Sequence, residues 1–140
     1  MATVQSSHTQ AVTLVRGGAE FTGKQGLRYT PGISAETAGS SGLHLQLVRL
    51  PPGARAKAHL HEAHETAVYG LSGRSGMWFG PKLEEHLEVG AGDFLYIPPG
   101  VPHLPYNPSD TEPCLAVIAR TDPNDQESVV LLPELDAIRA

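Results

Sequence analysis

Residues 92–107, GDFLYIPPGVPHLPYN, contain the most distinctive pattern of this sequence. The apolar and aromatic segment 93–97 is expected to form a strand, and the pair of prolines that follows would end it. Gly100 permits a backbone conformation that other residues rarely adopt, and a further proline stiffens the approach to His103. The segment therefore predicts a rigid turn that delivers one histidine.

A second informative segment covers residues 53–66, GARAKAHLHEAHET. His59 and His61 stand two residues apart in a predicted strand, 54–61, so their side chains leave the same face, with Cα atoms ~6.6–7 Å apart. Two imidazoles at this spacing can converge on one ion, with metal–nitrogen bonds of about 2.1 Å. A lone His-x-His pair is weak evidence, because exposed strands also carry it. His103, on the predicted turn, offers a third imidazole and makes a metal site the better interpretation of the pair.

The two segments together resemble the two motifs of the cupin superfamily. Gly92, Pro98, Gly100, His103 and Asn107 match the spacing of the second motif at every position. The first motif is matched by the glycine at 53, the histidines at 59 and 61, and an acidic residue at 65.

The resemblance covers residues 53–107 and implies a jelly-roll β-barrel that holds one transition metal. It also implies that His59, His61 and His103 are ligands. Histidine ligands suit Fe, Mn, Ni, Cu or Zn, and the ligand type alone does not choose among them.

The fourth ligand departs from the family pattern. In the usual motif, a glutamate is separated by six residues from a glycine, and here that position before Gly73 is Thr66. Glu65 lies one residue earlier, and a one-residue slip turns a strand side chain to the other face unless a bulge intervenes. Glu65 and His64 are therefore both candidates for the fourth ligand or for an acid–base group.

The run 59–66, HLHEAHET, also resembles the first motif of the pirins, which are bicupin relatives. In that motif a Glu-Thr pair has this spacing and the glutamate is not a ligand. The pirin carboxylate ligand lies two residues beyond the second-motif histidine, where this chain has Pro105. This resemblance implies a site of three histidines and water.

Frequent turn signals predict an all-β domain over residues 11–140, with its core over 53–119, after a flexible segment 1–10. The 15 glycines and 12 prolines divide the chain into short segments. Strands are expected over 11–15, 43–50, 54–61, 65–71, 77–79, 84–89, 93–97 and 114–119. Residues 31–42 are expected to form a loop, and 133–140 a short helix.

Composition excludes several partners. A net charge of −5 with ten basic residues argues against nucleic acid. No apolar run approaches the ~20 residues that span a membrane. A single cysteine, Cys114, and an N-terminus without signal-peptide features predict a cytoplasmic protein. Exposed barrel edges and the strand-like segment 11–15 predict a homodimer.

The leading hypothesis is a metal-dependent enzyme that acts on a small oxygen-rich substrate, with dioxygenase chemistry as first choice by resemblance to quercetin dioxygenase. Isomerase or decarboxylase chemistry occurs in the same superfamily and stays open. The alternatives from other classes are a non-catalytic module that binds a sugar or small acid, and a barrel that its metal merely stabilises.

Overall fold

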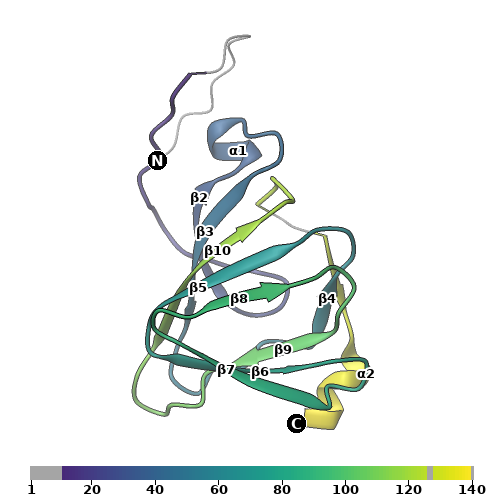
Figure 1. Cartoon of the computed structure of the whole chain (residues 1–140). Coiled ribbons are helices and arrows are strands. Elements are labelled where there is room, and N and C mark those ends of the chain that lie inside the picture. The colour runs from purple at the N-terminus through teal and green to yellow at the C-terminus, as the bar shows by residue number, and fades with distance from the viewer. Residues whose placement is uncertain (1–10, 126–127, 140) are drawn as a thin grey trace.

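The structure is a computed structural model, and it describes residues 11–125 and 128–139. The predicted flexible segment 1–10 lies outside the described residues. Two antiparallel sheets face each other and form a barrel (Figure 1). The all-β fold and the short C-terminal helix are therefore confirmed.

The first sheet has six strands among the described residues. Their order is β1 (Phe21–Thr22), β2 (Arg28–Ile33), β3 (His44–Leu50), β10 (Cys114–Arg120), β5 (Thr66–Ser72) and β8 (Phe94–Ile97).

The second sheet has five strands in the described part of the chain. Their order is β11 (Val129–Leu131), β4 (His59–His61), β9 (His103–Tyr106), β6 (Arg74–Phe79) and β7 (Glu85–Gly90). The helices are α1 (Ala35–Ala38) and α2 (Pro133–Asp136), and a 3₁₀ turn, Ala137–Arg139, follows α2.

Alternation along the strands separates the inside of the barrel from its outside. In β3 the burial pattern changes at nearly every residue, so that Gln46, Val48 and Leu50 face inward and Leu45 and Leu47 face outward. Inward apolar residues of β2, β3 and β10 belong to one buried cluster inside the barrel. A second cluster packs Leu135 of the C-terminal helix against the outer side of the second sheet.

Most predicted strands lie within one or two residues of the observed ones. Two of the expected elements are wrong. Residues 11–15 form no strand, and only the last three residues of the predicted strand 54–61 are one. The N–H of Ala56 donates to Pro105, that of Lys57 to Gln25 and that of Ala58 to Asp136, so segment 54–58 bonds to three separate parts of the chain instead of one neighbouring strand.

The predicted loop 31–42 is not a loop throughout, because it contains the end of a strand and a short helix. Strand β2 extends to Ile33, and Ser34 then begins helix α1 with a reciprocal capping box, in which Ser34 and Thr37 each bond the other's backbone N–H. Gly39 ends this helix in the left-handed conformation, with φ of 69°. No described helix has the length and apolar character that crossing a membrane requires.

Candidate metal centre

The three predicted histidines meet inside the barrel. His59 and His61 lie on β4, and His103 is the first residue of β9, where it pairs directly with His59. The side chains are buried, and one nitrogen from each ring lies within 4.8 Å of the others. The ring centroids of His59 and His103 are 4.3 Å apart, and those of His61 and His103 are 4.8 Å apart.

The turn before β9 holds His103 against β4. Gly100 adopts φ of 79°, in the left-handed region that favours glycine. Its N–H donates to the carbonyl of His61 at 2.7 Å, so the turn is tied to the strand that carries the other two histidines. The proline-stiffened turn predicted from residues 92–107 thus has a direct role in positioning the ring.

Backbone carbonyls fix two of the rings in the state that a metal requires. Nδ1 of His59 lies 2.6 Å from the carbonyl of Lys57, and Nδ1 of His103 lies 2.9 Å from that of Val101. A carbonyl only accepts, so each Nδ1 carries the hydrogen and each Nε2 carries the lone pair. Such outer partners orient metal-binding histidines in proteins. The donor set therefore fits a divalent transition metal.

Thr66 occupies the position from which the usual motif supplies a glutamate. Its side chain is buried, and its Oγ1 lies 3.1 Å from Nδ1 of His61. When His61 donates from Nδ1 to this hydroxyl, its Nε2 carries the lone pair, as in the other two rings. Thr66 is thus a supporting residue of the site. Its spacing from Gly73 placed it at the motif position, but no role was predicted for it.

Glu65 does not join the histidines, contrary to the expectation that it supplies a fourth ligand. It is exposed, and its carboxylate accepts a hydrogen bond of 2.9 Å from the hydroxyl of Tyr96, which raises the pKa of Tyr96. The bond lies on the outer side of the first sheet. Glu65 comes just before β5, whose first residue, Thr66, is buried and pairs with Ile97, so the one-residue slip leaves Glu65 outside and Thr66 inside.

His64 is buried beside the site but outside the group of three. Its ring stacks on that of His61 with centroids 4.7 Å apart, and its Nδ1 lies 3.7 Å from a carboxylate oxygen of Asp122. Burial raises the pKa of Asp122, but hydrogen bonds from the N–H groups of Asn124 and Ser128, with the charges of His64 and Arg120, hold it below its usual value. His64 therefore backs His61 rather than facing a ligand, which differs from its expected acid–base or ligand role. No sequence signal pointed to Asp122.

The three histidines line a cavity within the barrel. Its volume is about 70 Å³ for the centres of water-sized molecules. The remaining walls are mostly apolar, and the described residues that line them include no Asp, Glu, Lys or Arg. Cys114 is part of this lining, and burial raises the pKa of its thiol despite a hydrogen bond with Ser75.

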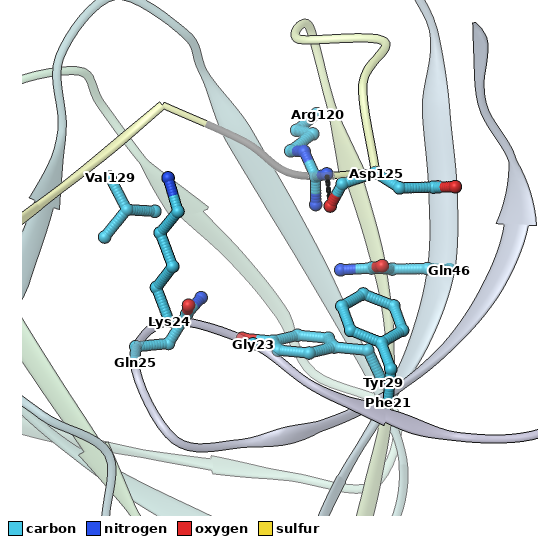
Figure 2. Close-up of a pocket in the computed structure, with 9 residues that line it drawn as sticks. All are labelled: Phe21, Gly23, Lys24, Gln25, Tyr29, Gln46, Arg120, Asp125 and Val129. Atoms are coloured by element: carbon cyan, nitrogen blue, oxygen red, sulfur yellow. Dashed lines mark hydrogen bonds between the residues drawn. The ribbon is translucent and has the colours of Figure 1, made fainter. Parts of the chain in front are cut away.

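A polar pocket adjoins this cavity. The two share Gln25, Tyr29 and Gln46. Figure 2 shows the Arg120 side chain beside Asp125, with Gln46 between them and the rings of Phe21 and Tyr29. Arg120 is buried and donates to the carbonyls of Asn124 and Asp125, so this guanidinium holds the loop after β10.

Comparisons with solved structures show proteins of the same fold. An oxalate decarboxylase of Bacillus subtilis has a TM-score of 0.66 and 22% identity over 82% of this chain, which spans only 30% of that protein. A second structure of that enzyme is described by its Mn(II) centres. A protein called TT1209 from Thermus thermophilus has a TM-score of 0.57 and 26% identity, with 69% of this chain and 83% of that chain covered.

A putative sugar phosphate isomerase from Acidithiobacillus ferrooxidans is also similar. Its TM-score is 0.57 and its identity 25%, with coverage of 74% of this chain and 65% of that one. A search of the curated proteins finds no match.

A family model described as the cupin domain matches residues 46–119, which is more than half of the chain. This segment includes most of β3, the two strands that carry the histidines, and all of β10 but its last residue. The fold, the pair of motifs and the family model agree, and the chain belongs to the cupin domain family.

Proposed function

We propose that this protein is a metal-dependent enzyme that holds one divalent transition metal through His59, His61 and His103 and acts on a small oxygen-containing substrate. The observation that carries the proposal is the convergence of three buried imidazoles on one cavity. Three protein ligands leave further positions on a metal open, and open positions are typical of catalytic rather than structural sites. A bound ion would supply Lewis-acid or redox chemistry there.

The lining of the cavity favours dioxygenase chemistry over isomerisation or decarboxylation. Reactions of the latter two kinds commonly need a side chain that moves a proton at the substrate. The described cavity lining offers no carboxylate or lysine, and its three histidines are assigned to the metal. The other side chains there with an ionisable proton are the phenol of Tyr29 and the thiol of Cys114, and burial raises the pKa of that thiol. His64, the other histidine nearby, lies behind His61. Oxygen chemistry can be supplied by the metal, and the chain's own residues then bind and orient the substrate.

The test begins with the metal itself. The protein is purified without added metal, and its metal content is measured by elemental analysis for the wild type and for His103→Ala. We expect about one ion per wild-type chain and a large loss in the variant. Glu65→Gln is the control, and it should keep its metal because Glu65 bonds to Tyr96 on the outside of the barrel. An equal metal content in wild type and His103→Ala would contradict the proposed site.

Catalysis is tested separately. Protein loaded with Fe, Mn, Ni or Cu is supplied with diketones, flavonols and sugars, and oxygen consumption is followed with an electrode. A dioxygenase consumes oxygen in proportion to product. Saturable binding without turnover for every metal would instead support the non-catalytic binding module. Turnover without oxygen consumption would support an isomerase or decarboxylase, the class suggested by the similarity to oxalate decarboxylase and to the putative sugar phosphate isomerase.

A further inference from the structure

The charge of the cavity lining restricts the substrate. Cavity walls are contributed by both sheets, and Val68, Met77, Leu95, Ile97 and Ile118 are among them. Its polar groups other than the histidines are neutral and include Gln25, Gln46, Thr66 and Ser75. A charged group placed against such walls loses its hydration and gains no ion pair, which costs far more than burying an apolar group. The cavity therefore disfavours a ligand with a charged group other than the one that would bind the metal.

The cations of the adjoining spaces lie outside the cavity. An apolar pocket shares Met77, Leu95, Ile97 and His103 with the cavity, and the one charged residue among those that line it in the described chain is Glu85. The polar pocket of Figure 2 contains Lys24 and Arg120, and the Arg120 guanidinium donates to two carbonyls of its own loop. Neither Lys24 nor Arg120 lines the cavity itself.

The size of the cavity sets a second limit. A volume of about 70 Å³ for molecular centres corresponds to roughly five water molecules, at ~10–15 Å³ for each. A small branched molecule matches this space. Among the described residues, Oε1 of Gln46 is buried without a hydrogen-bond partner, so the polar end offers a neutral acceptor.

From these observations we propose that the cavity takes a small molecule with an apolar body and with no charged group beyond the oxygens that bind the metal. This inference rests on the proposed function, since it assigns the substrate class of the same site. It separates this chain from a protein that acts on a dicarboxylate or on a sugar phosphate, the substrates that the names of its structural relatives indicate.

The experiment compares 2-oxo acids that share one metal-binding head and differ in the tail. Binding of 3-methyl-2-oxobutanoate, hydroxypyruvate and oxaloacetate to the metal-loaded protein is measured by calorimetry. We expect the isopropyl tail to bind at least about tenfold more tightly than either polar tail, because burial of its methyl groups is favourable and burial of a hydroxyl or carboxylate is not. Equal or tighter binding of oxaloacetate or hydroxypyruvate would overturn the substrate class and leave the metal site standing.

A pair of matched variants locates the binding. Val68→Phe fills the cavity from β5, and Ala116→Leu does so from β10 with a smaller change. Val130→Phe is the control, because it makes the same valine-to-phenylalanine change outside the cavity. Val130 on β11 pairs with Leu60 of β4, so its side chain lies on the face of the sheet opposite to the histidines. Both cavity variants should lose binding of 3-methyl-2-oxobutanoate at least about tenfold with unchanged metal content, and Val130→Phe should not. Unchanged binding in a folded cavity variant would refute the assignment to this cavity.

A metal-free arm separates the two proposals. If the protein holds no ion, the proposed function fails, and the cavity is then examined by NMR of its methyl groups with isobutanol and with glycerol. Shifts of Val68, Met77 and Ile118 with isobutanol alone would support an apolar ligand without a metal. Shifts of equal size with glycerol would refute it.

The outer face of the first sheet carries a second, independent inference. Two rows of directly paired residues cross the neighbouring strands β3, β10, β5 and β8 on this face. The first row is Leu47, Val117, Tyr69 and Phe94, and the second is Leu45, Ala119, Ala67 and Tyr96. We call these eight residues the outer patch. None of them is charged, and Phe94 and Tyr96 are 84% and 57% exposed.

In the described part of the chain, the outer face of the second sheet is covered by a helix and the outer patch of the first sheet is not. The C-terminal helix packs on the outside of the second sheet, where Leu135 contacts the cluster that includes Leu83 and Leu104. Arg139 also lies over the ring of Trp78, at 3.6 Å from its centroid. No described segment covers the outer patch in this way, and its five large side chains are partly or largely exposed.

We infer that the outer patch is the interface of a homodimer, with a second copy of this chain as its occupant. The exposed fractions of Tyr69, Phe94 and Tyr96 are 37%, 84% and 57%. A whole aromatic side chain buries about 150–250 Å², so these three rings offer roughly 270–450 Å² of the ~800 Å² that each partner buries in a standard interface. Two such faces can pack as stacked sheets, and none of the eight patch residues brings a charge of its own into that contact. This places the predicted homodimer on the face of the sheet rather than on segment 11–15.

The mass in solution tests the interface. Light scattering should give twice the chain mass of 14.9 kDa for the wild type. Val117→Glu puts a charge at the centre of the patch and should give single chains, while Thr111→Glu in an exposed loop should leave the dimer intact. Circular dichroism verifies that each variant is folded. A wild type that stays at the mass of one chain, or a folded Val117→Glu that stays dimeric, would refute the inference.

Discussion

Thr66 and Glu65 show how one position in a strand separates a site residue from a surface residue. Thr66 is buried with its hydroxyl at His61, whereas Glu65 is exposed and bonded to Tyr96. Successive side chains of a strand point to opposite faces, so the two neighbours cannot both reach the cavity. The family motif has a glutamate where this chain has a threonine, and the site is consequently built from three histidines.

Thr66→Val tests the support of His61. The substitution keeps the shape of the side chain and removes the hydroxyl that lies 3.1 Å from Nδ1 of His61. Loss of an outer partner of a metal-binding histidine typically lowers metal affinity 10–100-fold, roughly, and we expect a loss in this range. Competition with a chelator of known affinity measures it. Thr30→Val on β2 is the control, and a folded Thr66→Val protein with wild-type affinity would show that the hydroxyl has no such role.

At the scale of elements, two connections position β9. The first is the turn that ends at His103, in which the N–H of Gly100 donates to His61. The second follows the strand, where the buried amide of Asn107 donates to the carbonyls of Leu50, Pro51 and Glu112. Both residues belong to the sequence motif, and the structure shows that one shapes the turn and the other joins three chain segments.

Gly100→Ala should destabilise the protein through backbone strain alone. A Cβ at this position would meet nothing within 4 Å, but the residue has φ of 79°. A residue with a Cβ pays about 1–2 kcal/mol in this conformation, and urea unfolding should show a loss of that size. Gly42→Ala is the matched control, since a Cβ there also meets nothing and no left-handed φ is involved. Equal stability of the two variants would contradict the role given to Gly100.

Asn107→Ala should cost more, because it leaves buried carbonyls without their donor. We expect the free energy of unfolding to fall by about 2–3 kcal/mol, measured in urea. Asn107→Asp has the same shape and keeps the acceptor for the N–H of Ser109, but it removes the amide that donates to the three carbonyls. It should therefore be destabilising as well. A stable Asn107→Asp protein would show that the three donated bonds contribute little.

At the scale of the whole molecule, the metal is expected to connect the strands that carry its ligands. His59 and His61 lie on β4 and His103 on β9, two neighbours in the second sheet that share a short pairing at His59 and His103. An ion that binds only the folded protein stabilises it, by ~2.7 kcal/mol at about 100 times the Kd.

Chelation should accordingly lower the Tm of the metal-loaded wild type. For a protein of this size the loss corresponds to about 5–10 °C, and scanning calorimetry with and without a chelator measures it. His103→Ala should melt at one temperature under both conditions. A metal-loaded wild type whose Tm is unaffected by the removal of its ion would show that the ion does not stabilise the barrel.

The family, the all-β barrel, most strands and the histidines that meet in the cavity could be predicted from the sequence. This was possible because these features depend on local patterns, namely the alternation of apolar residues, the prolines and glycines that end strands, and the spacing of histidines on one strand face. Residues 92–107, for example, contain a strand, the turn that follows it and the histidine that the turn positions, and all three lie within one short segment.

The residues that surround the three histidines could not be predicted in this way, because they depend on long-range contacts. The orientation of Glu65 depended on which residue begins β5, and the place of His64 depended on Asp122, which is 58 residues away in the sequence. In the strand predicted over 54–61, residues 54–58 are not strand, because their hydrogen-bond partners, which include Gln25 and Pro105, belong to separate distant segments. Such features follow from contacts between residues far apart in the chain, and a local pattern contains no record of them.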